Sequence, residues 1–407
     1  MRPLQAFAQF TSGSIRIALR GSRGYYAWMA LLLAMVAVGA IAYCRQFTEG
    51  LIVTDLRDPV SWGFYIGNFT FLVGVAAAAV VLVIPAYVYN WKPIKELVIL
   101  GELLAISALA MCMLFVLVDM GRPDRLLHIM PMVGTQNLPS SLLAWDVVVL
   151  NLYFLLNLGV VTYLLVSLFR GREPNPRIFL PLVLLSIPMA VGIHTVTAFV
   201  YNGLPGRPFW NSAILAPRFL VSAFCSGPAI MLILLQILRR AARIDIKPEA
   251  IWKIAELMAY AMFVNLFLLG AEVFKEAYSD THHLKHMRYL FFGLEGKNAL
   301  VIWAWLSVVC SVVAFVLFLV PRFRKNYVTL NLGCALIFLG VFIEKGVGLV
   351  VPGFTPTVLG EIYEYAPTWI EIAISAGIFG VGGLLFTLMS RVAIAVTHGE
   401  FRLGGTG

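Results

Sequence analysis

The 407-residue sequence contains little charge: only 13% of its residues are Asp, Glu, Lys or Arg, whereas 60% are hydrophobic. About a quarter of the residues of an ordinary soluble domain are charged, so this composition excludes one. The five cysteines stand singly within apolar stretches. Neighbouring cysteines therefore cannot build an iron–sulfur cluster or a zinc site. The sequence also contains no P-loop, no dinucleotide-binding fingerprint and no nucleophile elbow.

Long apolar runs predict an all-α, polytopic membrane protein with ten transmembrane helices. A membrane span needs roughly 20 apolar residues, and ten segments reach that length: 25–44, 62–90, 97–118, 140–169, 178–201, 219–238, 251–274, 299–320, 329–350 and 367–390. We expect residues 25–390 to form one membrane domain, preceded by the N-terminal segment 1–24 and followed by the tail 391–407. Helices 2–5 (62–201) and 6–9 (219–350) have the same order of orientations. They are therefore expected to form two four-helix bundles, flanked by helices 1 and 10.

The distribution of basic residues predicts the orientation of the chain. Connectors on the side of the N-terminus hold 18 Lys and Arg residues, whereas the other connectors, although longer together, hold 10. By the positive-inside rule, both termini are expected in the cytoplasm and the longer loops outside. The net charge of +9 then reflects basic loops that face an anionic lipid leaflet, and nucleic acid is not expected as a partner. Residues 1–24 lack an apolar core with a cleavage site, so no cleavable signal peptide is expected.

Three polar residues on different helices share one depth near the predicted outer surface. Asn68, Asp146 and His194 each lie six or seven residues inside the outer end of their helix, which is roughly 10 Å at about 1.5 Å per residue. Other polar or aromatic residues expected at or just above this level are Asp119, Arg122, Tyr65 and Trp145. This coincidence of depth predicts a single polar site near the outer face.

A quinone site needs this set of side chains. The quinone ring requires flat stacking surfaces, its two oxygens require hydrogen-bond partners, and oxidation of a quinol releases protons that a base must accept. A carboxylate inside an apolar run is costly and indicates function, so Asp146 is the expected proton acceptor. Two structural alternatives remain open. Asn68 and His194 could bond each other or a backbone carbonyl as a link between helices, or Asp146 could pair with Arg122.

A second group of polar residues extends from the predicted inner face toward Asp146. It begins at Glu102 and continues with residues on the third and fourth helices, namely Ser107, Asn151, Asn157 and Thr162. Buried ionisable residues of this kind mark proton pathways in many membrane proteins. We expect either a proton path along this line or ordinary hydrogen bonding between helices.

Three further glutamates lie near the outer ends of later helices: Glu272, Glu344 and Glu371. Lys345 is the cation closest to them in the sequence. A buried ion pair is the simplest account of such a group, because an unpaired charge inside the membrane is expensive. A structural role is therefore expected for these residues.

The histidines argue against a haem in this chain. A b-type haem that links two helices needs a histidine from each, and His194 is the only histidine inside a predicted span. The string HHLKH places His282 and His286 at a spacing that could bind a metal on one helical face. A solvated loop with a role in docking is the expected alternative. We therefore expect no haem, metal or covalent cofactor, with quinone as a substrate.

Three motifs resemble those of the NrfD-like membrane subunits, typified by the membrane anchor of polysulfide reductase. They are WGFYIGNFTFLVG at 62–74, DMGRPDR at 119–125 and SSLLAWDVVVLNLY at 140–153. The ten-helix form is most similar to the DsrP type, the membrane subunit of an electron-transfer complex of sulfur metabolism. The resemblance implies two four-helix bundles, a menaquinone or ubiquinone site near the outer face of the first bundle, and an iron–sulfur subunit docked alongside.

Carried onto this sequence, the resemblance places the quinone site at Asp119 and Asp146, with Asn68, Tyr153 and His194 as neighbours. Together with the residue analysis, it predicts a quinone-interacting subunit of a respiratory complex in the cytoplasmic membrane of a prokaryote, active only within its complex. The expected partners are a ferredoxin-like iron–sulfur subunit at the outer face and other membrane and cytochrome subunits. A secondary transporter, a proton-translocating subunit without quinone chemistry, and a scaffold are the alternatives.

Overall fold

The computed structural model describes residues 3–95, 97–129, 133–135, 137–241, 246–280 and 283–403. Within this part of the chain, ten helical stretches are long and apolar enough to cross a membrane. This confirms the prediction of an all-α, polytopic membrane protein. The ten stretches are α2 (Arg23–Glu49), α3 to η2 (Phe64–Val88), α5 and α6 (Lys92–Asp119), α7 (Leu142–Phe169), α8 (Pro176–Asn202), α9 (Leu215–Ala241), α10 (Pro248–Ser279), α12 (Val301–Leu319), α14 and α15 (Tyr327–Phe354) and α16 (Trp369–Thr397).

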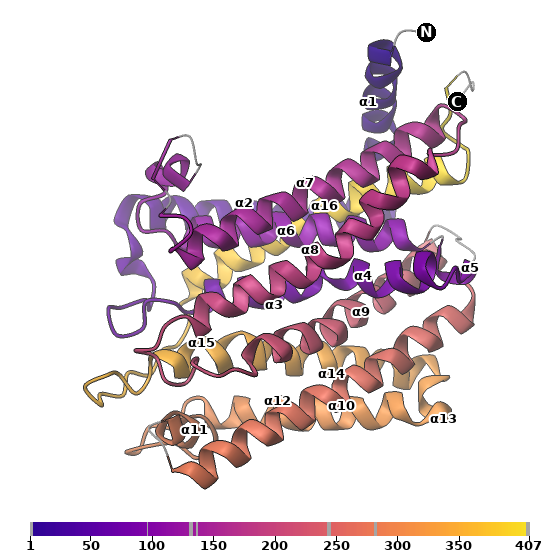
Figure 1. The fold of residues 1–407 in the computed structure, drawn as a ribbon. Coiled ribbons are helices and arrows are strands. Elements are labelled where there is room, and N and C mark those ends of the chain that lie inside the picture. The colour runs from indigo at the N-terminus through magenta and orange to yellow at the C-terminus, as the bar shows by residue number, and fades with distance from the viewer. Residues whose placement is uncertain are drawn as a thin grey trace.

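The long helices lie side by side and run between two ends of the molecule, and α1 (Pro3–Leu19) lies at the same end as the last turns of α16 (Figure 1). α3 packs against α6, α6 against α7, and α7 against α8, while α4 (Ala78–Val83) contacts α8. The later helices contact one another in the order α9, α10, α12, α14, and α14 returns to α9. Because α9 also packs against α3, α4 and α8, the core is continuous, and the division into two four-helix bundles stays a prediction.

The first span, α2, packs against the last span, α16. A Cβ added at Gly39 would lie 2.6 Å from the Cα of Gly377, so only glycine permits the two backbones to approach this closely. Small residues serve this purpose in membrane helices, where close packing takes the place of the hydrophobic effect. α16 also packs against α6, and the α2–α16 pair thereby flanks the helices that carry the predicted site.

Two of the spans are interrupted. The second span, Phe64–Val88, is interrupted at Ala77, where α3 (Phe64–Ala76) is followed by α4. It ends in the π-helical η2 (Ile84–Val88), which contains Pro85. Proline cannot donate a backbone hydrogen bond, which accounts for the irregular turn there. The ninth span breaks at Gly346, between α14 (Tyr327–Lys345) and α15 (Val347–Phe354). A Cβ on Gly67 would lie 3.2 Å from the Cα of Gly346, so the break is in close contact with α3.

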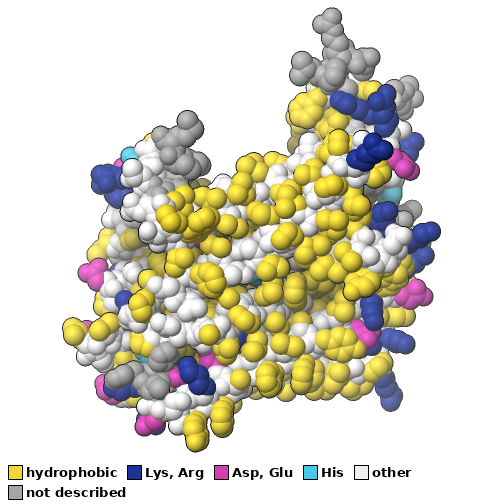
Figure 2. Space-filling view, in the orientation of Figure 1, with side chains coloured by type: hydrophobic (Ala, Val, Ile, Leu, Met, Phe, Trp, Pro, Cys, Tyr) yellow, Lys and Arg dark blue, Asp and Glu magenta, His cyan; other side chains and the backbone are white. Residues whose placement is uncertain are grey.

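Several helices extend beyond the apolar segments that predicted them. α2 continues to Glu49 and not to residue 44, and α16 continues to Thr397 and not to residue 390. Apolar content ends where the hydrocarbon ends, but helical hydrogen bonding continues into the polar layer. In Figure 2 hydrophobic side chains cover the middle of the visible face, and Lys and Arg gather toward the end that carries α1.

The remaining short elements lie in the connectors: η1 (Leu51–Val53), α5 (Lys92–Lys95), η3 (Pro123–Ile129), α11 (His283–Phe292) and α13 (Pro321–Arg324). The N-terminal segment 1–24, for which the sequence predicted no helix, contains α1. Its Phe10 ring contacts Phe169, with 5.4 Å between the ring centroids, so α1 is packed against the end of α7.

Candidate functional site

Asp146 lies in the first turns of α7 and is 7% exposed. The Thr197 hydroxyl on α8 donates a hydrogen bond to its Oδ1 at 2.6 Å. Arg122 lies elsewhere, since its guanidinium donates to both carboxylate oxygens of Asp124, at 3.0 and 2.8 Å, on the exposed surface. These bonds lower the pKa of Asp124. The alternative in which Arg122 pairs with Asp146 is therefore wrong, and Asp146 is held by a neutral donor.

Asn68 and His194 each bond the backbone of their own helix. The Asn68 amide donates to the Phe64 carbonyl at 2.7 Å, and His194 Nδ1 lies 2.7 Å from the Ala190 carbonyl. The alternative in which the two side chains bond each other is therefore wrong. Within the described residues, Asn68 Oδ1 and His194 Nε2 are buried and have no hydrogen-bond partner. An unpaired buried polar atom is costly, so both atoms are available to a ligand or water.

His194 faces a small polar cavity between α8 and the later helices. The cavity has a volume of about 10 Å³, and its polar lining is Thr70, His194, Ser222, Ser226 and Lys345. This volume is near the minimum that one water molecule requires. The imidazole therefore lies at the boundary between the first group of helices and the helices α9 and α14.

The sequence analysis missed three polar residues of this region. Thr197 bonds Asp146, and the Tyr201 hydroxyl lies 2.5 Å from the hydroxyl of Thr70 on α3. On α8, His194 is followed by Thr197 and Tyr201 at spacings of three and seven, which places all three on one helical face. This pattern could have identified the threonine and the tyrosine.

Tyr65 lies at the top of the same region and joins three helices. It is fully buried, its hydroxyl donates to Gln46 Oε1 at 2.6 Å, and Gln46 Nε2 donates to the Val118 carbonyl at 2.6 Å. Asp119 follows directly at the end of α6, and its buried Oδ1 has no partner among the described residues. Gln46, on α2, was not predicted for this region. It ties Tyr65 to the end of α6 beside Asp119.

The other two aromatic residues predicted for the site lie apart from Asp146. Trp145 is 40% exposed, and its indole N–H donates to the Pro139 carbonyl at 2.9 Å. Tyr153 is fully buried deeper in α7, where its hydroxyl lies 3.4 Å from the Ala76 carbonyl at the end of α3. Trp145 therefore contributes to the surface of the molecule, whereas Tyr153 fills the core between α7 and α3.

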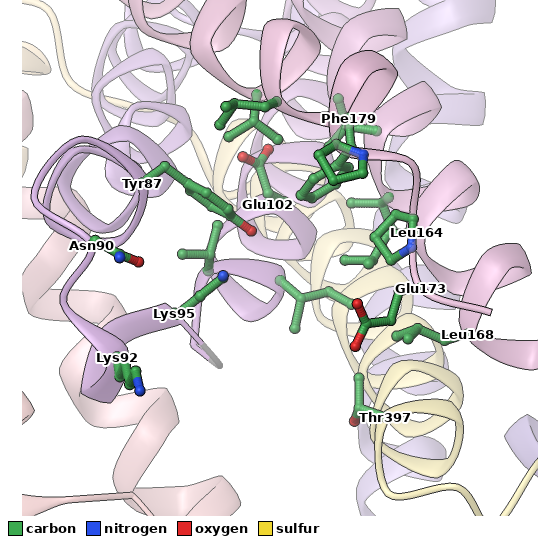
Figure 3. Close-up of a pocket in the computed structure, with 18 residues that line it drawn as sticks. Tyr87, Asn90, Lys92, Lys95, Glu102, Leu164, Leu168, Glu173, Phe179 and Thr397 are labelled. Atoms are coloured by element: carbon green, nitrogen blue, oxygen red, sulfur yellow. The ribbon is translucent and has the colours of Figure 1, made fainter. Parts of the chain in front are cut away.

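The second polar group is organised around Glu102, at the opposite end of the same helices. Glu102 is 2% exposed, and neither of its carboxylate oxygens has a partner in the described structure. It lines a cleft of about 890 Å³ formed by the start of α6, the end of α7 and the start of α8. Figure 3 shows its carboxylate, the Tyr87 hydroxyl and the Lys95 amine directed into the same space.

Three further residues of the predicted polar line bond their own helices. The acceptors are backbone carbonyls four residues earlier, and the donors are Ser107, Asn151 and Asn157. Asn157 Oδ1 remains buried without a partner among the described residues. These three bonds lie within single helices and do not link one helix to another, so they differ from the hydrogen bonding between helices that was the alternative to a proton path.

The expected buried ion pair of the later helices is present, with an additional member. Lys345 Nζ lies 3.6 Å from Glu344. Arg218 binds Glu272 and also Glu344, the latter at 2.8 Å, while Asn265 donates to Glu344 at 3.0 Å. Arg218 was not predicted because the apolar run begins only at residue 219. Two cations and two carboxylates neutralise one another within the core.

Glu371 and His286 have roles that the sequence did not predict. Glu371 does not join the ion cluster: it caps α16 by accepting hydrogen bonds from the Thr368 N–H and from the N–H of Asp55, at 2.9 and 3.0 Å. His286 is buried, and its Nδ1 lies 2.7 Å from the Pro352 carbonyl. The expectation of a solvated loop is wrong for this histidine, whereas His282 lies outside the described residues.

Comparison with known proteins places the chain among membrane subunits of oxidoreductases. Residues 52–355 match the family "Polysulphide reductase, NrfD". The chain is 26% identical to the Hdr-like menaquinol oxidoreductase integral membrane subunit of Archaeoglobus fulgidus, over 91% of this chain and 95% of that protein. It is 22% identical to the menaquinone reductase integral membrane subunit of Nitratidesulfovibrio vulgaris, over 89% and 90%. It is 26% identical to the C subunit of polysulfide reductase of Wolinella succinogenes, over 42% and 56%.

Replacing Arg218 by Met should prevent the chain from accumulating in the membrane. Removal of one partner from a buried ion cluster costs about 3–5 kcal/mol, because the remaining charges are left uncompensated. Arg122→Met, which breaks an exposed pair, is the matched control and should leave the amount of chain unchanged. Quantitative immunoblotting of membranes checks both variants. Equal amounts of the two would show that the buried cluster is not required for stability.

Proposed function

The chain belongs to the NrfD, or polysulphide reductase, family, and from this premise we propose that it is the quinone-interacting subunit of a respiratory complex. It exchanges electrons between the menaquinone or ubiquinone pool and an iron–sulfur subunit. Relatives that match about nine-tenths of the chain are named menaquinol oxidoreductase and menaquinone reductase membrane subunits. A role in sulfur metabolism draws support from the polysulfide reductase relative. Similarity to the DsrP type stays a prediction.

The observation that best supports this proposal is the group of polar atoms near one end of α3, α7 and α8. It combines the Asp146 carboxylate, which accepts from the neutral Thr197 hydroxyl, with the buried Asn68 and His194 atoms that have no partner in the described part of the chain. A quinol hydroxyl needs an acceptor, and a quinone oxygen needs a donor. The carboxylate, the Asn68 oxygen and the imidazole Nε2 are acceptors, because His194 Nδ1–H donates to the Ala190 carbonyl. The protonated form of Asp146 is the donor for a quinone oxygen.

In the proposed reaction, oxidation of the quinol breaks its two O–H bonds and releases two protons and two electrons. Asp146 accepts the two protons one after the other, and each passes toward Asp119 and then to the outer aqueous phase. His194 or Asn68 orients the second ring oxygen. The electrons leave to the iron–sulfur partner, because this chain is proposed to carry no haem, metal or covalent cofactor. The same residues serve in reverse when quinone is reduced.

Asp146→Asn should leave the complex assembled but slow quinol oxidation by about 100-fold or more, since the amide cannot take up the proton. Because Arg122 binds Asp124, the substitution leaves no arginine unpaired, and the loss of activity should not be accompanied by loss of protein. Thr197→Val, which deletes only the hydroxyl that orients the carboxylate, should have a smaller effect. The measurement is the rate of quinol oxidation per amount of subunit. Normal turnover in the Asn variant would leave Asp119 or His194 as the base.

A second candidate function, proton uptake from the cytoplasmic side, is favoured by the position of Glu102. Its two unpaired oxygens line a cleft of about 890 Å³, large enough for many water molecules. We propose that Glu102 exchanges protons with this cleft and that Asn157 lies on the route toward the quinone site. This would let quinone chemistry near the outer face draw on protons from the cytoplasm.

Glu102→Gln should lower by at least half the number of protons taken up from the cytoplasmic side per electron during quinone reduction, while quinol oxidation, which releases protons, remains near normal. The amide keeps the size of the side chain but cannot carry a proton. Glu173→Gln is the control, because Glu173 lines the same cleft but is exposed at its rim. Proton uptake by the complex in sealed vesicles is the measurement. Unchanged uptake in the Gln variant would exclude this function.

We also propose that the chain lies in the cytoplasmic membrane of a prokaryote, with both termini in the cytoplasm. Supporting this, the predicted inner connectors carry 18 basic residues and the outer ones 10. A fusion reporter placed after Gly407 that functions only in the cytoplasm should be active, and one that functions only outside should be silent. The reverse result would invert the assignment of the two faces. A fusion within residues 119–139 should give the opposite pattern.

A further inference from the structure

The connector between α15 and α16, residues 355–368, ends in an apolar tip. Val358 and Leu359 are 80% and 88% exposed. Just below the tip, the Thr357 N–H donates to the Glu361 carbonyl at 2.8 Å, and the Gly360 N–H donates to the Thr357 carbonyl at 2.9 Å. The turn is therefore closed by its own backbone, and it presents two hydrophobic side chains without covering them.

The base of this connector is fixed to the segment before α3. Asp55 accepts hydrogen bonds from the Tyr363 hydroxyl at 3.0 Å and from the Ala366 N–H at 2.8 Å. The Tyr365 hydroxyl donates to Glu371 and accepts from the Phe64 N–H at 2.8 Å. Burial and the adjacent Glu371 raise the pKa of Tyr365, so the phenol remains protonated. These hydrogen bonds fix the base of the loop to Asp55 and to Phe64, the first residue of α3.

The tip projects away from the region that lipid covers. In Figure 1 the loop after α15 extends past the ends of the long helices, at the end opposite to α1. Figure 2 shows hydrophobic side chains at the outermost point of that loop. Glu361, two residues after the tip, is exposed, and residues 351–366 contain no Lys or Arg. A hydrophobic pair beyond the helix ends, with a carboxylate beside it, is suited to a protein surface and not to the acyl chains of a bilayer.

We propose that the Val358–Leu359 tip is the anchor on which the extramembrane electron-transfer subunit docks at the outer face. The partner presents an apolar cleft bordered by a basic side chain, which matches the tip and the exposed Glu361 carboxylate beside it. A stiff anchor loses little conformational entropy on binding. Because the base of the loop contacts Phe64, the docked subunit would lie above Tyr65 and Asn68. This inference rests on the proposed function, since it identifies the docking surface of the same complex.

The first test places a photoactivated crosslinking amino acid at Leu359 in the assembled complex in native membranes. A crosslink should form to the extramembrane subunit that co-purifies in equal amount with this chain. Val328, 76% exposed at the other end of the molecule, is the control position and should form none to that subunit. Crosslinks only to lipid, or only to a second copy of the chain, would overturn the proposal.

The second test replaces both Val358 and Leu359 by Ser. The loss of two buried aliphatic side chains should weaken retention of the extramembrane subunit by about 10-fold or more, with the amount of membrane chain unchanged. Val328→Ser should retain the subunit fully. Full retention by the double variant would contradict the docking role. Quinone binding to the chain is measured in parallel: its absence would refute the proposed function, whereas normal binding with unchanged retention would refute only the docking surface.

Discussion

The absence of water inside the bilayer is the constraint on which the rest of this structure depends. A backbone or side-chain polar group in the hydrocarbon must find a partner within the protein, because no solvent can replace it. Many side chains of the spans meet this requirement by bonding the carbonyl four residues earlier, as those of Thr70, Ser107 and Asn151 do. The exceptions carry the functional argument, since their cost must be offset by a ligand, a water molecule or a proton.

The buried polar groups divide into two kinds. The cluster of Arg218, Glu272, Glu344 and Lys345 is internally neutral, and it lies beside the break in the ninth span at Gly346. Asp146 and Glu102 lack any cation within ion-pair distance among the described residues. The first kind stabilises the contact between α9, α10 and α14. The second kind is suited to proton exchange, because a proton can neutralise a carboxylate that no cation neutralises.

The two unpaired carboxylates lie at opposite ends of the same group of helices. Asp146 occupies the first turns of α7, whereas Glu102 lies near the start of α6, at the end to which α7 runs. Free polar atoms of Asn157 and His194 lie on the helices between these ends. Quinone chemistry at one end and a solvent-accessible cleft at the other would therefore be connected through α7 and α8. The loop between α15 and α16, which is tied to Asp55 and Glu371, adds a stiff support at the same end as Asp146.

The sequence by itself determined the ten spans and the family, because a hydrocarbon layer imposes a length and a polarity that any apolar segment reveals. It also indicated Lys345 as a partner for the group of glutamates that includes Glu344. Only the tertiary structure decided which polar atoms meet across helices. Thr197 with Asp146, Gln46 with Tyr65, and Arg218 with both glutamates join residues far apart in the sequence. Such pairings depend on the rotation of each helix about its axis, which almost uniformly apolar spans leave unspecified until the side chains pack.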